Sequence, residues 1–369
     1  MKDSWAEINL ATLRSNLAAI RASLMPSTDI IVLLKADAYG HGLGLVAPAA
    51  WQCGIRRFAV FHREEALQLR TLLPQADILW LGAAEPSDAA LILEARLQPF
   101  LITAEQARGL AREAVRLGGL IAAHAKIDSG MGRLGFNWET APTELLSLAD
   151  LPGLQILGAA THFASAGGAD RAFADLQMTR FRQVIADCRR GGLALPFCHA
   201  ANSDGLCRTP DWHLDAVRPG ILLYGYGPGT AGAPATRPFL QWKTRLIQVK
   251  AVPAGFPVSY DSTYRTPRAT RIATIPVGYS DGYSRAWSNR AEILVGGRRA
   301  RLAGRVTMNL IMADLGPDSP AQAGDEAVLL GEQGGASLWA HELAALSGTI
   351  SYEVLTSIRG PRLPVEAHD

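Results

Sequence analysis

The sequence predicts an α/β protein in which an N-terminal (β/α)8 barrel of the TIM type, residues 1–235, is followed by a mostly antiparallel β domain, residues 236–369. Two observations predict this fold. Up to the domain boundary, short apolar runs alternate with amphipathic helical patterns, whereas helical patterns almost vanish beyond it. In addition, a chain of 369 residues is too long for one ordinary hydrophobic core, which favours two domains.

Apolar runs along the first part of the chain predict the barrel strands. These runs are Ile30–Leu34, Phe58–Phe61, Ile78–Leu81, Pro99–Ile102, Ile121–Ile127, Ile156–Thr161, Leu195–Cys198 and Ile221–Tyr224. Between several of them, apolar residues recur at the three- and four-residue spacing of helices, in Glu64–Leu73, Ala104–Leu117 and Asp175–Arg190. Strands that are apolar throughout, each followed by a helix, indicate a parallel sheet covered on both faces. A doubly wound open sheet is the alternative architecture.

A change of composition at Gly225–Pro238, where Gly, Pro and Ala dominate, predicts a linker between the domains. Its first part, Gly225–Gly229, can also be read as a phosphate loop, an interpretation to which we give less weight. After the linker, short runs of alternating polarity predict antiparallel strands at Thr244–Val252, Arg271–Val277, Glu292–Val295, Ala300–Leu302, Leu310–Leu315 and Glu326–Leu330. A short helix is expected over Leu338–Ser347, and the first few residues of the chain are expected to pair with this domain.

Charge and cysteine content exclude several classes of protein. The formal net charge is +2, from 36 basic and 34 acidic residues without a basic cluster, so we expect no nucleic-acid or membrane partner. The N-terminus has no apolar export signal and no stretch reaches membrane-spanning length, which predicts a cytoplasmic protein. The four cysteines have no Cys-x-x-Cys spacing, which favours free thiols and argues against a metal site.

One lysine occupies a position typical of catalytic groups. Lys35 directly follows the apolar run Ile30–Leu34, and catalytic groups collect where barrel strands end. Burial there disfavours the ammonium form and frees the amine to form a Schiff base. An isolated lysine would more often lie on the surface, but Gly40 and Gly42 follow and allow a sharp turn or close approach to an anion.

The segment from Lys35 to Gly42 closely resembles the cofactor-binding motif of alanine racemases. Segments similar to the same family follow in the expected order over nearly the whole chain, and the ordered series is far more specific than any one motif. They are Lys126–Phe136, Thr161–Phe163, His199–Ser203, Val217–Ile221, Val258–Tyr260, Pro276–Tyr279, Gly304–Met308 and Ser351–Glu353.

This resemblance implies a pyridoxal-phosphate enzyme that racemises alanine with two bases. Lys35 would carry the cofactor as a Schiff base and act on the D-alanine face, while Tyr260 would act on the L-alanine face. A phenol has a pKa of about 10 unless nearby cations lower it. His162 and Arg218 are the expected sources of that environment. In the family the tyrosine comes from the other subunit, which implies a homodimer with shared active sites.

The resemblance also assigns cofactor contacts. Arg218 would face the pyridine nitrogen and, because arginine stays protonated, would leave the ring neutral. His41 and His199 are expected to be hydrogen-bonding groups and not bases. The phosphate would be bound by backbone N–H groups and hydroxyls of Tyr39, Ser203, Gly220, Ile221 and Tyr352.

Three further residues are assigned to the substrate by the same resemblance. Arg133 would contact the cofactor's phenolic oxygen and the substrate carboxylate, and the backbone N–H of Met308 would be a second carboxylate donor. Lys126 resembles the lysine that carries a carbamate in the family. The negative charge of a carbamate would orient Arg133, whereas an unmodified lysine beside that arginine would be electrostatically unfavourable.

Substrate choice depends on an access channel and on one departure from the family pattern. Tyr264, Tyr279 and Tyr352 are expected to narrow the channel and favour a methyl side chain. Many alanine racemases have Met-Asp where this chain has Met308-Asn309, which replaces a carboxylate by an amide and adds a donor. A racemase of serine or of several small amino acids is therefore an alternative.

Functions of other classes are also alternatives. Barrel-type pyridoxal-phosphate decarboxylases are disfavoured because the surroundings of their cofactor lysine differ from Lys35–Tyr39. A non-catalytic pyridoxal-phosphate-binding protein with a single barrel would lack the second domain and Tyr260. The D-alanine formed could supply cell-wall synthesis, as a peptidoglycan precursor, or belong to alanine catabolism, and the sequence leaves both open.

Overall fold

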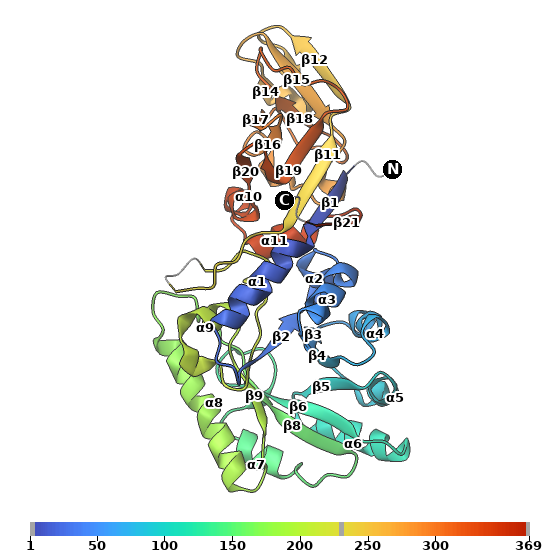
Figure 1. The fold of residues 1–369 in the computed structure, drawn as a ribbon, viewed down its shortest axis with the longest axis vertical. Coiled ribbons are helices and arrows are strands. Elements are labelled where there is room, and N and C mark those ends of the chain that lie inside the picture. Colours follow the sequence, from blue (N-terminus) through green and yellow to red (C-terminus); the bar gives the residue numbers. More distant parts are fainter. Residues whose placement is uncertain (1–3, 229–231, 367–369) are drawn as a thin grey trace. The chain divides into compact units, whose positions relative to one another are not determined.

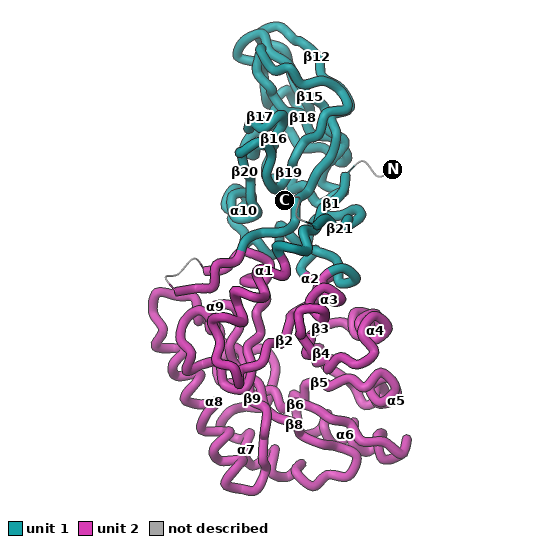
Figure 2. Tube along the Cα trace, in the orientation of Figure 1, with its two compact units in different colours: residues 1–12, 39–45, 237–369 teal, residues 13–38, 46–236 magenta. Residues whose placement is uncertain are grey.

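The computed structural model describes residues 4–228 and 232–366. The chain divides into two compact units (Figure 2). Residues 13–38 and 46–236 form one unit, here called the barrel unit, and residues 1–12, 39–45 and 237–369 form the other, here called the sheet unit. The predicted linker Gly225–Pro238 includes residues 229–231, which lie outside the described residues.

The barrel unit contains a closed parallel barrel (Figure 1). Eight strands follow one another in the order β5-β4-β3-β2-β10-β9-β8-β6, and pairing of β6 with β5 closes the ring. All these pairings are parallel, so the predicted (β/α)8 barrel is confirmed. The strands are β2 (Asp29–Leu33), β3 (Arg57–Val60), β4 (Asp77–Ala83), β5 (Leu97–Leu101), β6 (Ile121–Asp128), β8 (Leu154–Ala160), β9 (Phe197–His199) and β10 (Ala216–Val217).

Helices connect the strands and explain why the strand residues are apolar on both faces. Four of the five residues of β2 are buried, because side chains fill the barrel on one face and helices cover the other. Helix α6 begins after Thr103, whose hydroxyl accepts the N–H of Gln106, and it buries an alanine-rich stripe. The helices are α1 (Leu10–Ala22), α3 (Leu43–Gln52), α4 (Arg63–Leu72), α5 (Ala89–Glu94), α6 (Ala104–Arg116), α7 (Ala141–Leu146), α8 (Ala172–Arg190) and α9 (Ser203–Arg208).

The predicted eighth strand is wrong. Ile221–Tyr224 forms a turn in which the N–H of Leu223 donates to the Gly220 carbonyl at 2.9 Å. The eighth place in the ring belongs to β10, the two residues immediately before Arg218. The run Ile221–Tyr224 is buried, so its apolar character indicated burial correctly but could not indicate the backbone conformation.

The sheet unit is built on a mostly antiparallel sheet, as predicted. Its main strand order is β12-β15-β18-β17-β16-β19-β11-β1-β21, with β20 on β19, and among the described residues only β1 and β21 pair in parallel within it. The N-terminal strand β1 (Ser4–Asn9) thus lies between β11 and β21. The remaining strands are β11 (Leu240–Arg245), β12 (Gln248–Val252), β15 (Thr270–Ile275), β16 (Glu292–Val295), β17 (Arg298–Leu302), β18 (Ile311–Asp314), β19 (Glu326–Gln333), β20 (Ala336–Leu338) and β21 (Arg362–Val365).

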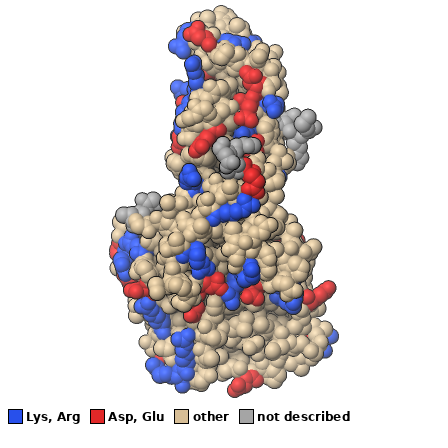
Figure 3. Space-filling model, viewed as in Figure 1, with Lys and Arg blue, Asp and Glu red and all other residues tan. Residues whose placement is uncertain are grey.

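Smaller elements complete the sheet unit. A hairpin of β13 (Pro257–Val258) and β14 (Tyr264–Arg265) encloses a short 3-10 turn, Tyr260–Ser262. Helices α10 (Ala340–Ser347) and α11 (Ser351–Ser357) follow β20. None of the helices in the described part of the chain combines the length and apolar character that crossing a bilayer requires. Basic and acidic side chains are both spread over the face drawn in Figure 3.

Candidate active site

The chain leaves β2 through a left-handed turn, α2 (Lys35–Tyr39). Ala36, Asp37, Ala38 and Tyr39 all have φ between 52° and 55°. A left-handed conformation costs a non-glycine residue roughly 1–2 kcal/mol, so four in a row persist only where the surroundings hold them. Lys35 therefore begins a strained segment at the carboxyl end of a barrel strand.

The side chain of Glu65 holds this turn to the start of α4. Its Oε1 accepts the N–H of Asp37 at 3.3 Å, and its Oε2 accepts the N–H groups of Phe61 and His62, each at 3.0 Å. Sequence reasoning missed Glu65. Its place as the third residue of α4 was the available signal, because a glutamate there commonly accepts backbone N–H groups at the start of a helix.

The amine of Lys35 lies in an environment that favours its neutral form. Burial lowers the pKa of Lys35, and the positive charges of Arg133 and Arg218 lower it further. Glu65 opposes this effect, because a negative charge stabilises the ammonium form. A neutral amine is the form that can act as a nucleophile or a base.

Lys126, on β6, is a second lysine whose amine has a lowered pKa. Burial lowers the pKa of Lys126 to about 7, with a further contribution from Arg218 and a smaller one from Arg133, while Asp128 opposes the change. The amine donates a hydrogen bond of 2.9 Å to the carbonyl of Ile127. Both lysines that sequence analysis singled out therefore share the influence of Arg218 and Arg133.

Arg218 is fixed by acceptors from neighbouring strand ends. Its Nη2 donates to the carbonyl oxygens of Thr161 at 2.7 Å and Ala200 at 2.9 Å, and lies 3.3 Å from Nδ1 of His162. Its Nη1 lies 2.5 Å from Nδ1 of His199. Burial lowers the pKa of Arg218 to about 10, which still leaves the guanidinium charged at neutral pH.

The two histidines that contact Arg218 are held neutral, so the expectation that His162 supplies positive charge for Tyr260 is wrong. Burial, followed by the charge of Arg218, lowers the pKa of His162 to about 2 and that of His199 well below its usual value. Since arginine has no acceptor, the Nδ1 atom of each ring accepts the hydrogen bond. The expected hydrogen-bonding role of His199 is confirmed.

Ser203, Gly220 and Ile221 come together where α9 begins. The buried hydroxyl of Ser203 accepts the backbone N–H groups of Gly220 at 3.0 Å and of Leu222 at 3.1 Å. Ile221 lies between these two donors in the chain. Because the oxygen of this hydroxyl already accepts two bonds, its own hydrogen is available for an acceptor such as a phosphate oxygen.

Two tyrosines of the sheet unit form a pair. The ring centroids of Tyr39 and Tyr352 are 5.8 Å apart. Tyr39 is buried, and burial together with the neighbouring Tyr352 raises the pKa of Tyr39. Its phenol therefore stays protonated and can donate a hydrogen bond.

Tyr260 lies on an exposed, strained loop of the sheet unit. Its side chain is 70% exposed, and Ser259, Asp261 and Ser262 have φ values of +65°, +58° and +48°. Asp261 forms an ion pair of 2.9 Å with Arg305, which connects the loop to the segment between β17 and β18. Strained loops of this kind are found mainly at functional sites.

The other expected site residues of the sheet unit have different surroundings. Met308 and Tyr279 are exposed, whereas the hydroxyl of Tyr264 donates to Oδ2 of Asp314 at 2.7 Å. Burial and this bond raise the pKa of Tyr264 to about 12. Asn309, the departure from the family pattern, donates from Nδ2 to the hydroxyl of Ser280 at 2.9 Å.

Together these features define a class of protein: a parallel barrel with a lysine of lowered pKa at the end of a strand, joined to an antiparallel sheet unit. The chain belongs to the alanine racemase family. Sequence profiles of the alanine racemase N-terminal and C-terminal domains match residues 8–228 and 239–366.

Similar proteins cover almost the full length. An alanine racemase of Syntrophobacter fumaroxidans is 43% identical over 97% of this chain and 96% of its own length. The structure of alanine racemase from Clostridium difficile 630 covers 99% of this chain and 96% of its own, with a TM-score of 0.93 and 32% identity. That from Bartonella henselae, with covalently bound pyridoxal phosphate, covers 99% of this chain and 100% of its own, with a TM-score of 0.87 and 27% identity.

The contacts of Glu65 generate a prediction for Lys35. In Glu65→Gln the pKa of Lys35 should fall further, because the negative charge that raises it is gone. Rates of amine modification of Lys35 in the cofactor-free protein, followed by mass spectrometry across pH, should show a midpoint at lower pH than in the unsubstituted chain. Hydrogen exchange at Asp37 should also accelerate, because its acceptor is weakened.

Glu64→Gln is the matched control, since Glu64 precedes Glu65 in the same helix and is absent from the interactions that shift Lys35. An equal shift in both variants, or a shift toward higher pH in Glu65→Gln, would contradict the assignment.

Proposed function

We propose that this chain is an alanine racemase, an isomerase that interconverts L-alanine and D-alanine with pyridoxal phosphate as its cofactor. The observation that carries the proposal is the Lys35 amine, which lies at the carboxyl end of a barrel strand and has a pKa lowered by burial and by two arginines. Membership of the family over both units supports it. We place the enzyme in the cytoplasm, where its product would serve cell-wall synthesis or alanine catabolism.

The charges around Lys35 fit an anionic cofactor and an amino-acid substrate. Arg133 and Arg218 both act on Lys35 and on Lys126, and the opposing charges in these interactions are Glu65 and Asp128. Such an excess of basic groups favours a phosphate and a carboxylate. The cofactor, when bound, draws electrons from the substrate's α-carbon and so makes its proton removable.

Different residues would bind the cofactor's reactive group, its ring, its phosphate and the substrate. Lys35 would hold the cofactor and act as the base on the D-alanine face, and Arg133 would bind the carboxylate. Arg218, fixed by its acceptors, would direct a remaining N–H to the pyridine nitrogen and keep that ring neutral. The hydroxyl of Ser203 and the backbone N–H of Ile221 would hold the phosphate. Gly220, whose own N–H donates to Ser203, would leave room for it, and Tyr39 and Tyr352 would add phenol donors.

We propose further that Tyr260 works in the active site of a partner subunit, opposite Lys35, in a homodimer. Tyr260 is 70% exposed, which is unsuitable for a base that must be shielded from water. Other large apolar side chains of the sheet unit are also exposed, and a partner that covers them would gain stability from their burial. They include Tyr279, Met308, Leu310, Ile350 and Tyr352.

Mixed dimers test this proposal most directly. Lys35→Ala and Tyr260→Phe should each abolish racemisation of alanine, since each removes one base, with a loss of about 10²-fold or more. When the two variants are unfolded and refolded together, half of the dimers are mixed and one of their two sites keeps both bases, so about one quarter of wild-type activity should return.

The control is a mixture of either variant with itself. No return of activity in the mixture of the two variants would contradict the shared site.

Two further measurements test the cofactor and the substrate. Borohydride should abolish a visible absorbance band in the wild type, and Lys35→Ala should lack that band. Equal rates on L-alanine and L-serine would replace the alanine assignment by a broader one.

We also propose that Lys126 carries a carbamate that orients Arg133. A neutral amine reacts with CO2, and the pKa of Lys126 of about 7 makes that form abundant at neutral pH. The negative carbamate would offset the adjoining positive charges of Arg133 and Arg218. In the unfolded chain the amine would be charged, so the modification depends on the fold.

The carbamate should appear in a crystal structure of the bicarbonate-grown protein and should increase as pH rises through about 7, because deprotonation frees the amine. Lys126→Ala should raise KM for alanine, and chloride or acetate should partly restore it by replacing the negative charge. An unmodified lysine at pH 8.5, well above this pKa, would contradict the proposal.

A further inference from the structure

Two buried histidines contact each other inside the barrel unit, and one of them binds Arg218. His124, on β6, is 2% exposed and His199, at the end of β9, is 0% exposed. Their ring centroids are 5.4 Å apart in an edge-to-face arrangement. Phe100 and Phe197 pack against both imidazoles, at centroid distances from 5.7 to 6.5 Å. The pair is thus enclosed by apolar rings.

The hydrogen positions of both rings follow from their partners. Arg218 can only donate, so Nδ1 of His199 accepts and the ring carries its hydrogen on Nε2. In His124, Nε2 lies 3.3 Å from Oε1 of Gln98 and therefore donates, which leaves a lone pair on Nδ1. Burial lowers the pKa of His124 to about 4 and that of His199 well below its usual value, so neither ring gains a second hydrogen at neutral pH.

One buried donor and one buried acceptor are left over. Among the described residues, neither Nε2 of His199 nor Nδ1 of His124 has a hydrogen-bond partner. Buried polar groups in folded proteins almost always have one, supplied by protein or by an ordered water. The two leftover groups are complementary and belong to neighbouring rings.

We propose that one internal water molecule joins His199 to His124, and that His124 is thereby a positioning residue for Arg218. The water would accept from Nε2 of His199 and donate to Nδ1 of His124. Hydrogen bonds would then run in one direction from Arg218 through His199, the water and His124 to Gln98. This deepens the proposed function, because Arg218 is the side chain assigned to the cofactor's pyridine nitrogen.

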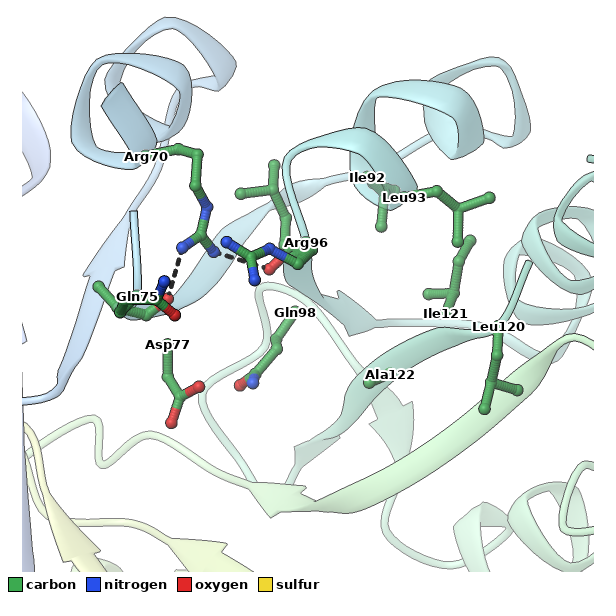
Figure 4. A pocket seen from close by; sticks show the side chains of 12 residues that line it. Arg70, Gln75, Asp77, Ile92, Leu93, Arg96, Gln98, Leu120, Ile121 and Ala122 are labelled. Carbon is green, nitrogen blue, oxygen red and sulfur yellow. Dashed lines mark hydrogen bonds between the residues drawn. The ribbon is translucent and has the colours of Figure 1, made fainter. Parts of the chain in front are cut away.

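The proposed water and His124 would favour the tautomer of His199 that carries its hydrogen on Nε2. If His199 carried its hydrogen on Nδ1, that N–H would face the N–H of Arg218, and the guanidinium would have to move. The far end of the series is open to solvent, since Gln98 is among the side chains that line a pocket of about 440 Å³ at the beginnings of β4, β5 and β6 (Figure 4). The series therefore connects two ends of the barrel.

Two substitutions of His124 separate this role from simple packing. Asparagine can place its amide oxygen where His124 has Nδ1, whereas leucine offers no acceptor. In protein labelled with ¹⁵N-histidine, His199 of the wild type should show its hydrogen on Nε2, with and without cofactor. His124→Asn should preserve that spectrum. In His124→Leu the Nε2 hydrogen of His199 loses its acceptor, so part of the His199 population should carry the hydrogen on Nδ1 despite Arg218.

The kinetic readout follows the same pattern. In His124→Leu, kcat for alanine should fall about tenfold with little change in KM, because a misplaced Arg218 affects the reacting complex more than substrate binding. His124→Asn should recover most of this loss. Gln98→Leu, a change at the pocket end that is less demanding for folding, should alter the ¹⁵N signal of His124.

Several results would overturn the inference. They are an unchanged His199 spectrum in a folded His124→Leu protein, a hydrogen on Nδ1 of wild-type His199, or an atomic-resolution crystal structure without a water between the two nitrogens. If the wild type neither bound pyridoxal phosphate nor racemised alanine, the proposed function would fail. The spectra of the cofactor-free protein would still decide whether His124 and His199 are linked.

Discussion

Burial of basic groups at the strand ends of the barrel, strengthened by their mutual repulsion, sets the chemistry of the site. Lys35 and Lys126 both have a lowered pKa, and in each case the charges of Arg133 and Arg218 contribute. The lysines respond by favouring their neutral forms, since arginine does not give up its proton at neutral pH. In a site of this kind the amines lose their protons more readily than usual, while the arginines stay charged and can bind anionic ligands.

Backbone strain and side-chain bonds place these groups. The left-handed turn after β2 directs the chain that follows Lys35, and Glu65 connects it to α4. Arg218 is placed differently, by acceptors that come from the ends of neighbouring strands. In the sheet unit, strain recurs on both sides of Tyr260. Each proposed base is therefore carried by, or lies next to, a backbone segment that only its surroundings can maintain.

The parts of the structure that depend on local pattern could be predicted from the sequence. Buried parallel strands are apolar throughout, so seven of the eight barrel strands matched apolar runs, and Lys35 could be placed because it directly follows one. The eighth strand, Ala216–Val217, is too short to produce a pattern. The left-handed turn has no signal in residue preference, since alanine, aspartate and tyrosine rarely adopt it.

Contacts between distant segments were also beyond sequence reasoning. Glu65 lies 28 residues from Asp37, and His199 lies 19 residues from Arg218, so only the closed barrel brings each pair together. The family resemblance assigned individual residues to the site, but it gave no reason for the neutral histidines or for the proposed link between His199 and His124. Those follow from burial and hydrogen-bond direction, which require coordinates.

Exchange of the substrate's α-hydrogen with D2O tests separately, for each face of the carbon, whether two bases act on opposite faces. In Tyr260→Phe, exchange into D-alanine should continue, because Lys35 is intact, while exchange into L-alanine should fall by about 10²-fold or more. Equal loss of exchange for both enantiomers, or undiminished exchange into L-alanine, would contradict the assignment of Lys35 and Tyr260 to separate faces.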